Sequence, residues 1–133
     1  MGISETEIEE YLKQLNVIPK QQASVWGSVM PSLLNMALFG PTATLFDLRY
    51  HILHSTDREI VIIGVDSITG KMRPEHTIIP IQQIKNIELK KGVIANKLII
   101  ESEIGVMKYR INKTMVGSKW HKVNLHNFLT TIR

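Results

Sequence analysis

The side chains that could bind a metal or move a proton near neutral pH are five histidines: His51, His54, His76, His121 and His126. None of them stands in a His-Glu-x-x-His arrangement, the spacing that places two zinc ligands on one helix face. His51 and His54 are three apart on a predicted strand and therefore point to opposite faces. His121 and His126 are five apart on a predicted helix, which is poor geometry for one shared metal. We therefore expect surface or capping histidines, without a metal or another cofactor.

The other residues that could support catalysis form no recognisable site. The chain contains no cysteine, which excludes disulfides, thiolate zinc sites and cysteine nucleophiles. It also lacks a nucleophile elbow, a phosphate-binding loop and a dinucleotide fingerprint. Glu101 and Glu103 share a face at strand spacing, but they adjoin a predicted hairpin and are expected to be solvated. The sequence thus predicts a protein that is not an enzyme, and an enzyme without a recognisable motif is the lesser alternative.

Positive charge is concentrated in the last third of the chain. The formal net charge is +4, yet residues 85–133 alone carry ten basic and three acidic side chains. Four of these cations are expected on one outer face of neighbouring strands and form the candidate anion-binding set: Lys90, Lys97, Lys108 and Arg110. Such a face could attract an anionic membrane surface, a phospholipid headgroup or nucleic acid.

The same pattern limits the choice among anionic partners. Tyr109 alternates with Lys108 and Arg110, so it should face inward and cannot supply a platform on which bases stack. Nucleic acid is therefore the least supported of the three. A charged and solvated face remains the alternative, with Glu88 and Glu101 pairing with the cations across the strands.

The beginning of the chain is expected to form a helical extension. Ser4 and Glu7 form a capping box ahead of apolar residues at helical spacing, which predicts a helix over 5–15. Apolar residues also surround much of a predicted helix over 21–39, and a proline within it should start a separate short helix over 32–39.

The second part of this extension is too apolar for a free linker. It must pack on the domain, on a second copy of the chain or on a membrane surface. Six of its apolar residues form the candidate interface: Trp26, Val29, Leu33, Leu34, Met36 and Phe39. Self-association through these residues and packing onto the same chain are both left open.

The central region changes to the alternating apolar pattern of β-strands. Strands are expected over about 46–53, 59–65, 77–79, 85–91, 97–101 and 106–111. The β-branched run in the second of these is typical of a strand buried on at least one face. Helical spacing returns after Ser118, a candidate cap, and the apolar stripe of this helix should lie on the sheet: Val123, Leu125, Phe128, Leu129 and Ile132.

Three segments of this region resemble the bacterial pleckstrin-homology-like (PH-like) family. They are Ser-Thr-Asp-Arg and the apolar strand after it (55–62), Ile-Pro with isoleucines following (79–87), and Lys-Lys-Gly (90–92) ahead of Leu-Ile-Ile (98–100). The match covers about residues 44–132. The resemblance implies a bent antiparallel barrel closed by a C-terminal helix. It also implies a general binding or assembly role, since bacterial relatives often act in self-assembly or protein contacts.

We therefore expect a mainly β (α+β) protein. A helical extension over 1–40 should precede a PH-like domain over 41–133, a bent antiparallel barrel or sandwich capped by the C-terminal helix. The predicted function is a non-catalytic module for protein–protein contacts, including self-association, and an anion-directed module is the alternative; no small-molecule substrate is identified. The chain starts without a signal-peptide pattern, and no apolar run reaches the roughly 20 residues of a membrane span, so a cytoplasmic location is expected.

Overall fold

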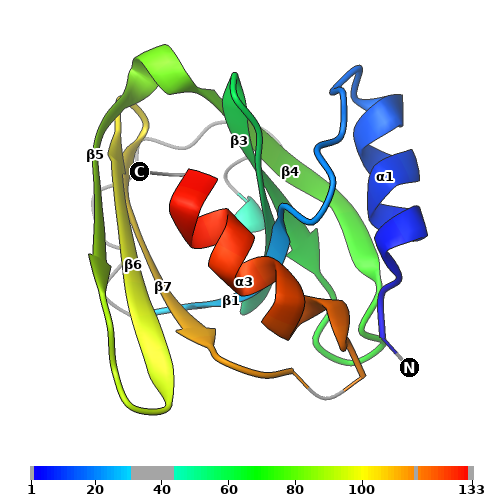
Figure 1. The fold of residues 1–133 in the computed structure, drawn as a ribbon. Helices are drawn as coiled ribbons and strands as arrows, with labels where there is room; N and C mark the ends of the chain where they lie inside the picture. Colours follow the sequence, from blue (N-terminus) through cyan, green and yellow to red (C-terminus); the bar gives the residue numbers. More distant parts are fainter. Residues whose placement is uncertain (1, 31–43, 116, 132–133) are drawn as a thin grey trace.

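The computed structural model describes residues 2–30, 44–115 and 117–131. Seven strands form one antiparallel sheet in the order β4-β3-β2-β1-β7-β6-β5. In chain order they are β1 (Ser24–Val29), β2 (Tyr50–Ser55), β3 (Glu59–Val65), β4 (Met72–Pro80), β5 (Ile84–Lys90), β6 (Ala95–Ser102) and β7 (Gly105–Asn112). The sheet is bent, so that β1–β4 and β5–β7 form two halves with the helix α3 (Trp120–Thr131) at the opening between them (Figure 1).

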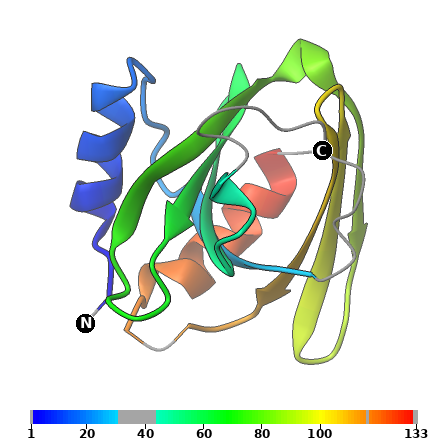
Figure 2. The same ribbon diagram turned by 180° about the vertical axis from the view of Figure 1, so that it is seen from behind.

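The helix α1 (Glu5–Gln14) confirms the predicted N-terminal helix. Ser4 Oγ accepts a hydrogen bond from Glu7 N at 3.1 Å, and Glu7 Oε1 accepts one from Ser4 N at 3.2 Å, so the capping box is present. Asn16 follows the helix with a φ of 61°, a left-handed conformation that asparagine adopts more readily than most residues. The helix lies on the side of the β1–β4 half that faces away from α3 (Figure 2).

The two helices bury opposite faces of the β1–β4 half of the sheet. The inner core lies between the two halves and α3, and includes Leu53, Ile62, Leu98, Tyr109 and Phe128. The outer core lies beneath α1, and includes Ile8, Leu12, Ile52, Val61 and Ile63. Alternate residues of β2 and β3 enter the two cores, so both strands are buried along nearly their whole length. This double burial explains why β3 reads as an unbroken apolar run.

The bent antiparallel sheet and its C-terminal helix are confirmed, but the strands do not close into a complete barrel, because β4 and β5 are the two edges of an open sheet. The short 3-10 helix η1 (Ile81–Gln83) connects them and turns the chain away from β4. Pro80, the last residue of β4, has no N–H to donate to a neighbouring strand. The sheet therefore bends around the inner core without closing.

The segment Ser24–Val29 is a central strand, and the helix expected there is wrong. It pairs with β2 from Ser24 to Ser28 and with β7 at Ser28 and Val29. Val25 enters the inner core and Trp26 packs against the outer core. A strand covered on both faces lacks the polar positions that make alternation visible in a sequence. The short helix expected over 32–39 lies outside the described residues.

The remaining strands agree with the predicted pattern, with two changes of length. β2 begins at Tyr50 rather than near residue 46, because residues 45–48 form a turn in which Leu48 N donates to Leu45 O at 3.1 Å. β4 extends over nine residues, well beyond the expected 77–79.

The C-terminal helix is present, but the stripe that faces the sheet differs from the prediction. Leu125 and Phe128 are buried as expected, whereas Val123 is 61% exposed. The buried side instead contains His121 and Asn124. Two further members of the predicted stripe lie outside the described side chains: Leu129 and Ile132.

These two polar residues of α3 occupy the place where β1 and β7 separate. β7 pairs with only the last part of β1, which leaves backbone groups of residues 24–26 without a strand partner on that side. His121 Nδ1 accepts a hydrogen bond from Trp26 N at 3.0 Å, and Asn124 Nδ2 donates one to Ser24 O at 3.1 Å. The helix thus satisfies backbone groups that would otherwise be buried without partners.

Candidate anion-binding site

Three of the four candidate cations lie in one row across β5, β6 and β7. In the register of the sheet, Lys90 is opposite Lys97, and Lys97 is opposite Arg110. The Cβ atoms of directly opposed residues are about 5 Å apart in antiparallel strands. We call these three residues the cation row, because their side chains leave the same outer face of the sheet next to one another.

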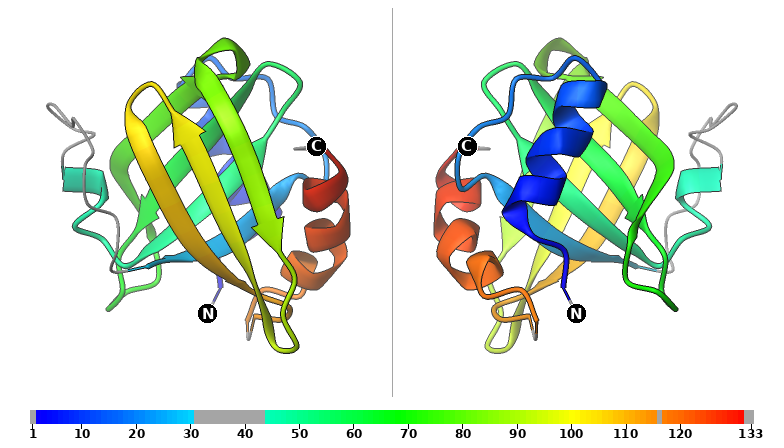
Figure 3. Two further views of the ribbon diagram at one scale, coloured as in Figure 1. Left: turned by 90° about the vertical axis from the view of Figure 1, so that its left-hand side faces the viewer. Right: turned by 90° about the vertical axis from the view of Figure 1, so that its right-hand side faces the viewer.

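The cation row borders a shallow hollow of about 390 Å³. Its lining includes all three residues of the row together with Lys91 from the β5–β6 turn, and the described lining contains no acidic residue. No described helix covers this side of β5, β6 and β7, as Figure 3 (left) shows. Among the described residues, no helix separates the row from solvent.

Little negative charge offsets the row. Within the described part of the chain, its one ion pair joins Lys90 Nζ to Glu88 Oε1 at 3.9 Å, and both side chains are exposed. Such pairs contribute only about 0–1 kcal/mol. Arg110 Nε donates to Asn112 Oδ1 at 3.2 Å. Because like charges directly opposite one another destabilise a sheet, a bound anion would relieve a repulsion that is built into the register.

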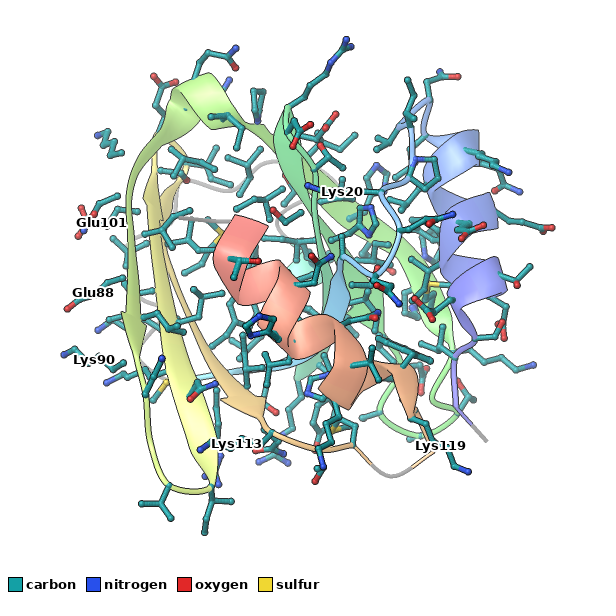
Figure 4. All side chains as sticks on the ribbon, in the orientation of Figure 1. Lys20, Glu88, Lys90, Glu101, Lys113 and Lys119 are labelled. Carbon is teal, nitrogen blue, oxygen red and sulfur yellow. The ribbon has the colours of Figure 1, made fainter. Side chains whose placement is uncertain are left out.

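The acid–base pairs expected across the strands are wrong. Glu88 is opposite Ile99, while Glu101 is opposite Asn86 on one side and Val106 on the other. The register thus places both glutamates opposite uncharged residues. Figure 4 shows these two side chains projecting outward from the same side of the sheet as Lys90. The positive row is therefore not neutralised from the neighbouring strand.

Lys108, the fourth candidate, lies one row away. It shares the outer face with Arg110, two residues along β7, but it is opposite Ile99. It does not line the hollow and is half-buried. The structure therefore brings three of the four candidates together and leaves Lys108 at the margin.

The candidate interface is described at only two of its six residues. Trp26 packs against the outer core, and its Nε1 donates to Ser118 Oγ at 3.0 Å. Val29 packs against the inner core. The other four lie outside the described residues: Leu33, Leu34, Met36 and Phe39. Self-association through this surface stays a prediction.

Three histidines are buried rather than at the surface, which corrects the expectation from the sequence. The first, His51, lies in the inner core. Its Nε2–H donates to Leu45 O at 2.9 Å, so its Nδ1 accepts from the hydroxyl of Tyr109 at 2.7 Å. Burial lowers the pKa of His51 to about 4, although hydrogen bonds to the backbone act in the opposite direction. The ring is therefore neutral and structural.

His54 is held in the same way on the opposite face of β2. Its Nε2 accepts from Lys20 N at 3.0 Å, so its Nδ1 carries the proton and donates to Ser24 Oγ at 2.6 Å. Burial, and to a smaller extent the charge of Lys20, lowers the pKa of His54 to about 4. A ring that donates to a serine cannot take its proton, so Ser24 is not activated as a nucleophile.

His121 completes the set at the start of α3. Its Nε2–H donates to Asn112 O while its Nδ1 accepts from β1, and burial lowers its pKa. Each of the three rings thus bonds one fixed donor and one fixed acceptor. In the described ranges, no group of three or more histidine or acidic side chains is placed to hold a metal ion.

Two other hollows bear on function. One of about 260 Å³ is lined by Lys20, Arg58, Asp57 and Glu59 but not by His54. Opposite charges are mixed there, and Lys20 Nζ lies 3.3 Å from Asp57 Oδ1, so the hollow has no net preference for an anion. The other, of about 310 Å³, is lined by Trp26, Tyr50 and also Arg110, which belongs to the cation row as well.

Sequence reasoning did not predict that Lys91 lines the hollow, nor that the three cations of the row lie directly opposite one another on neighbouring strands. Both could have been found by counting outward from the turn between residues 90 and 97, because a hairpin turn fixes which residues oppose one another. The buried histidines gave no such signal, since His51 and Tyr109 are 58 residues apart.

Among the described residues, no helix is long and apolar enough to cross a membrane. No family model, curated protein or solved structure matches the chain.

Proposed function

We propose that this chain is a non-catalytic binding module of PH-like architecture, and that its cation row captures an anionic partner. The observation that carries the proposal is the register Lys90–Lys97–Arg110, which aligns three cations beside an open hollow. Charge-assisted hydrogen bonds from lysine and arginine to phosphate or carboxylate oxygens are the strongest that such a surface can make.

Support for the architecture comes from the strand order and from the position of the helix. Seven antiparallel strands in the order β4-β3-β2-β1-β7-β6-β5, followed by one helix packed on β1 and β2, fit a PH-like fold. The sequence segments that resemble the family fall at the β2–β3 turn, at the β4–β5 connection and in the β5–β6 hairpin.

The non-catalytic part of the proposal rests on the histidines. Both nitrogens of each of the three buried rings form hydrogen bonds with backbone, serine or tyrosine groups. None of them lines the hollow beside the cation row. The site therefore offers charge and hydrogen-bond donors but no described general base.

Binding of a soluble polyanion tests the proposal. Short-chain polyphosphate should bind the wild-type protein at low salt and weaken as salt rises, because charge–charge attraction is screened. The double variant Lys97→Gln/Arg110→Gln should lose about tenfold or more in affinity, measured by calorimetry.

A matched control removes two cations elsewhere. Lys13 on α1 and Lys122 on α3 are both exposed, and Lys13→Gln/Lys122→Gln changes the net charge equally. This control should keep its affinity within about twofold, since surface charges beyond a Debye length are screened. Equal losses in the two double variants would show that only the overall charge matters, and would overturn the assignment to the row.

A further inference from the structure

The turn between β5 and β6 carries two adjacent apolar side chains in water. Val93 is 93% exposed and Ile94 is 73% exposed. Other strongly exposed aliphatic residues of the described chain, such as Ile18, Ile68 and Val123, stand singly, as is normal on protein surfaces. Two neighbours at the tip of one hairpin form a small apolar point.

The hairpin tip is held in a defined shape. A Cβ placed on Gly92 would lie 2.3 Å from Ala95 O, so the turn closes tightly at a residue without a side chain. Lys113 N donates to Ile94 O at 3.3 Å, which ties the tip to the end of β7. A tip that is already ordered loses little conformational entropy on binding.

Lysines surround this apolar point. Lys91 precedes it in the turn, and the backbone bond of Lys113 places another lysine beside it. Lys90 ends β5 and Lys97 lies near the start of β6. Each is three residues along the chain from Val93 or Ile94, and is therefore at most about 10 Å from the tip. Figure 4 shows Lys113 and Lys119 toward the same end of the molecule as the β5–β6 turn.

We infer that the β5–β6 hairpin docks on an anionic lipid bilayer, with Val93 and Ile94 entering the interface and the surrounding lysines contacting phosphates. This inference rests on the proposed function, because the cation row supplies much of the charge attraction. The headgroup layer is roughly 5–8 Å deep on each side. A tip at its inner boundary would therefore place the row, at most about 10 Å behind it, close to the outer boundary, where long lysine and arginine side chains can reach phosphates.

The arrangement of the whole end of the molecule agrees with this orientation. The β3–β4 turn, the β5–β6 turn and the connection from β7 to α3 lie at one end of the fold (Figures 1 and 3). Ile68 in the β3–β4 turn is 92% exposed and is followed by Lys71. This second turn could thus reach the same surface.

Other partners fit this surface less well. A single-stranded nucleic acid stacks its bases on aromatic side chains, whereas the tip is aliphatic and Tyr109 is buried. A second copy would bring two rows of like charge together, and two side chains fall far short of the roughly 800 Å² per partner of a stable interface.

Sedimentation with vesicles tests the inference. Wild-type protein should bind vesicles of phosphatidylcholine with a minority of phosphatidylserine, and should bind pure phosphatidylcholine much less. Val93→Ser/Ile94→Ser should weaken binding to the anionic vesicles by about tenfold or more. The matched control Ile18→Ser/Val123→Ser also replaces one exposed isoleucine and one exposed valine, and should bind within about twofold of wild type.

A label reports whether the tip leaves water. Since the chain has no cysteine, Val93→Cys and Ile18→Cys can each carry one environment-sensitive fluorophore. On anionic vesicles the label at 93 should shift to the blue and brighten, and the label at 18 should not. An unchanged label at 93, or tighter binding to single-stranded RNA with no effect of Val93→Ser/Ile94→Ser, would overturn the inference.

The two proposals fail separately. Val93→Ser/Ile94→Ser should leave polyphosphate affinity unchanged, because neither side chain belongs to the cation row. If polyphosphate binds and requires the row while vesicles do not bind, the bilayer inference is wrong and the anion-binding function stands. If the row variant binds polyphosphate as wild type does, the proposed function itself is wrong.

Discussion

The outer faces of the two halves of the sheet differ in whether a described helix covers them. On the β1–β4 half, Val61 and Ile63 are buried beneath α1. On the β5–β7 half, the corresponding face carries Lys97, Ile99 and Arg110 and has no described helix over it (Figure 3). One half is therefore a double-sided core, and the other is a core on one side and a charged surface on the other.

This difference separates residues that maintain the fold from residues that are free to bind. The buried histidines His51 and His54 belong to the doubly covered half and bond only to protein groups. The cations of the open half have few protein partners. Changes in the first half should therefore affect stability, and changes in the second should affect binding.

Acid should destabilise the protein through the doubly covered half, and this is the largest effect that we expect. His51 and His54 have pKa values of about 4 when folded and about 6.5 when unfolded. The unfolded chain binds more protons between these values, so stability is full above about pH 6.5 and falls as the pH drops toward 4. The loss is on the order of 3 kcal/mol for each histidine at pH 4. Urea unfolding at several pH values measures it.

A histidine variant makes this test specific. His54→Gln should remove the contribution of one proton from the dependence of the free energy of unfolding on pH, because the pKa of His54 is lowered by burial in the folded protein. A free energy of unfolding that changes by less than about 1 kcal/mol between pH 7 and pH 5 would contradict the neutral, buried histidines.

Truncating one isoleucine on each outer face compares the two halves directly. Ile63→Ala should lower the free energy of unfolding by about 2–5 kcal/mol, because it leaves a cavity beneath α1. Ile99→Ala, on the half-exposed outer face of β6, should cost about 1 kcal/mol or less. Equal losses in urea unfolding would mean that the β5–β7 face is covered in solution.

The smallest effect is expected for a cation of the row. Lys97→Gln removes a charge that faces Lys90 on one side and Arg110 on the other. The free energy of unfolding should stay constant or rise by up to about 0.5 kcal/mol, because like charges in register repel. A loss of more than about 1 kcal/mol would assign Lys97 a structural role that its contacts do not provide.

Prediction from the sequence was more accurate for the β5–β7 half, which has one apolar and one polar face, than for the β1–β4 half, which is buried on both faces. In β5, β6 and β7 inward residues such as Leu98 and Tyr109 alternate with charges, so the strands and their faces were predicted correctly. In β1, Val25 and Trp26 are both covered, and their spacing suits a helix equally well. Patterning therefore fails where both faces are apolar.

The candidate site was predictable only in part for a related reason. The basic character of one face follows from alternation along each strand, but the row depends on register between strands. Buried polar residues are even harder to predict from the sequence. His121 and Asn124 are buried on α3 because they form hydrogen bonds with backbone groups of β1, which lies almost a hundred residues earlier in the chain. No local pattern records such partners.

Backbone amide shifts in a titration with short-chain polyphosphate test the central claim most directly. At low salt, we predict that the largest changes fall on residues 90–97 and 108–112, with little change along β3, and that raised salt abolishes them. Changes centred on the hollow around Lys20 and Arg58, or spread evenly over all basic residues, would contradict the claim that the open outer face of β5–β7 is the binding surface.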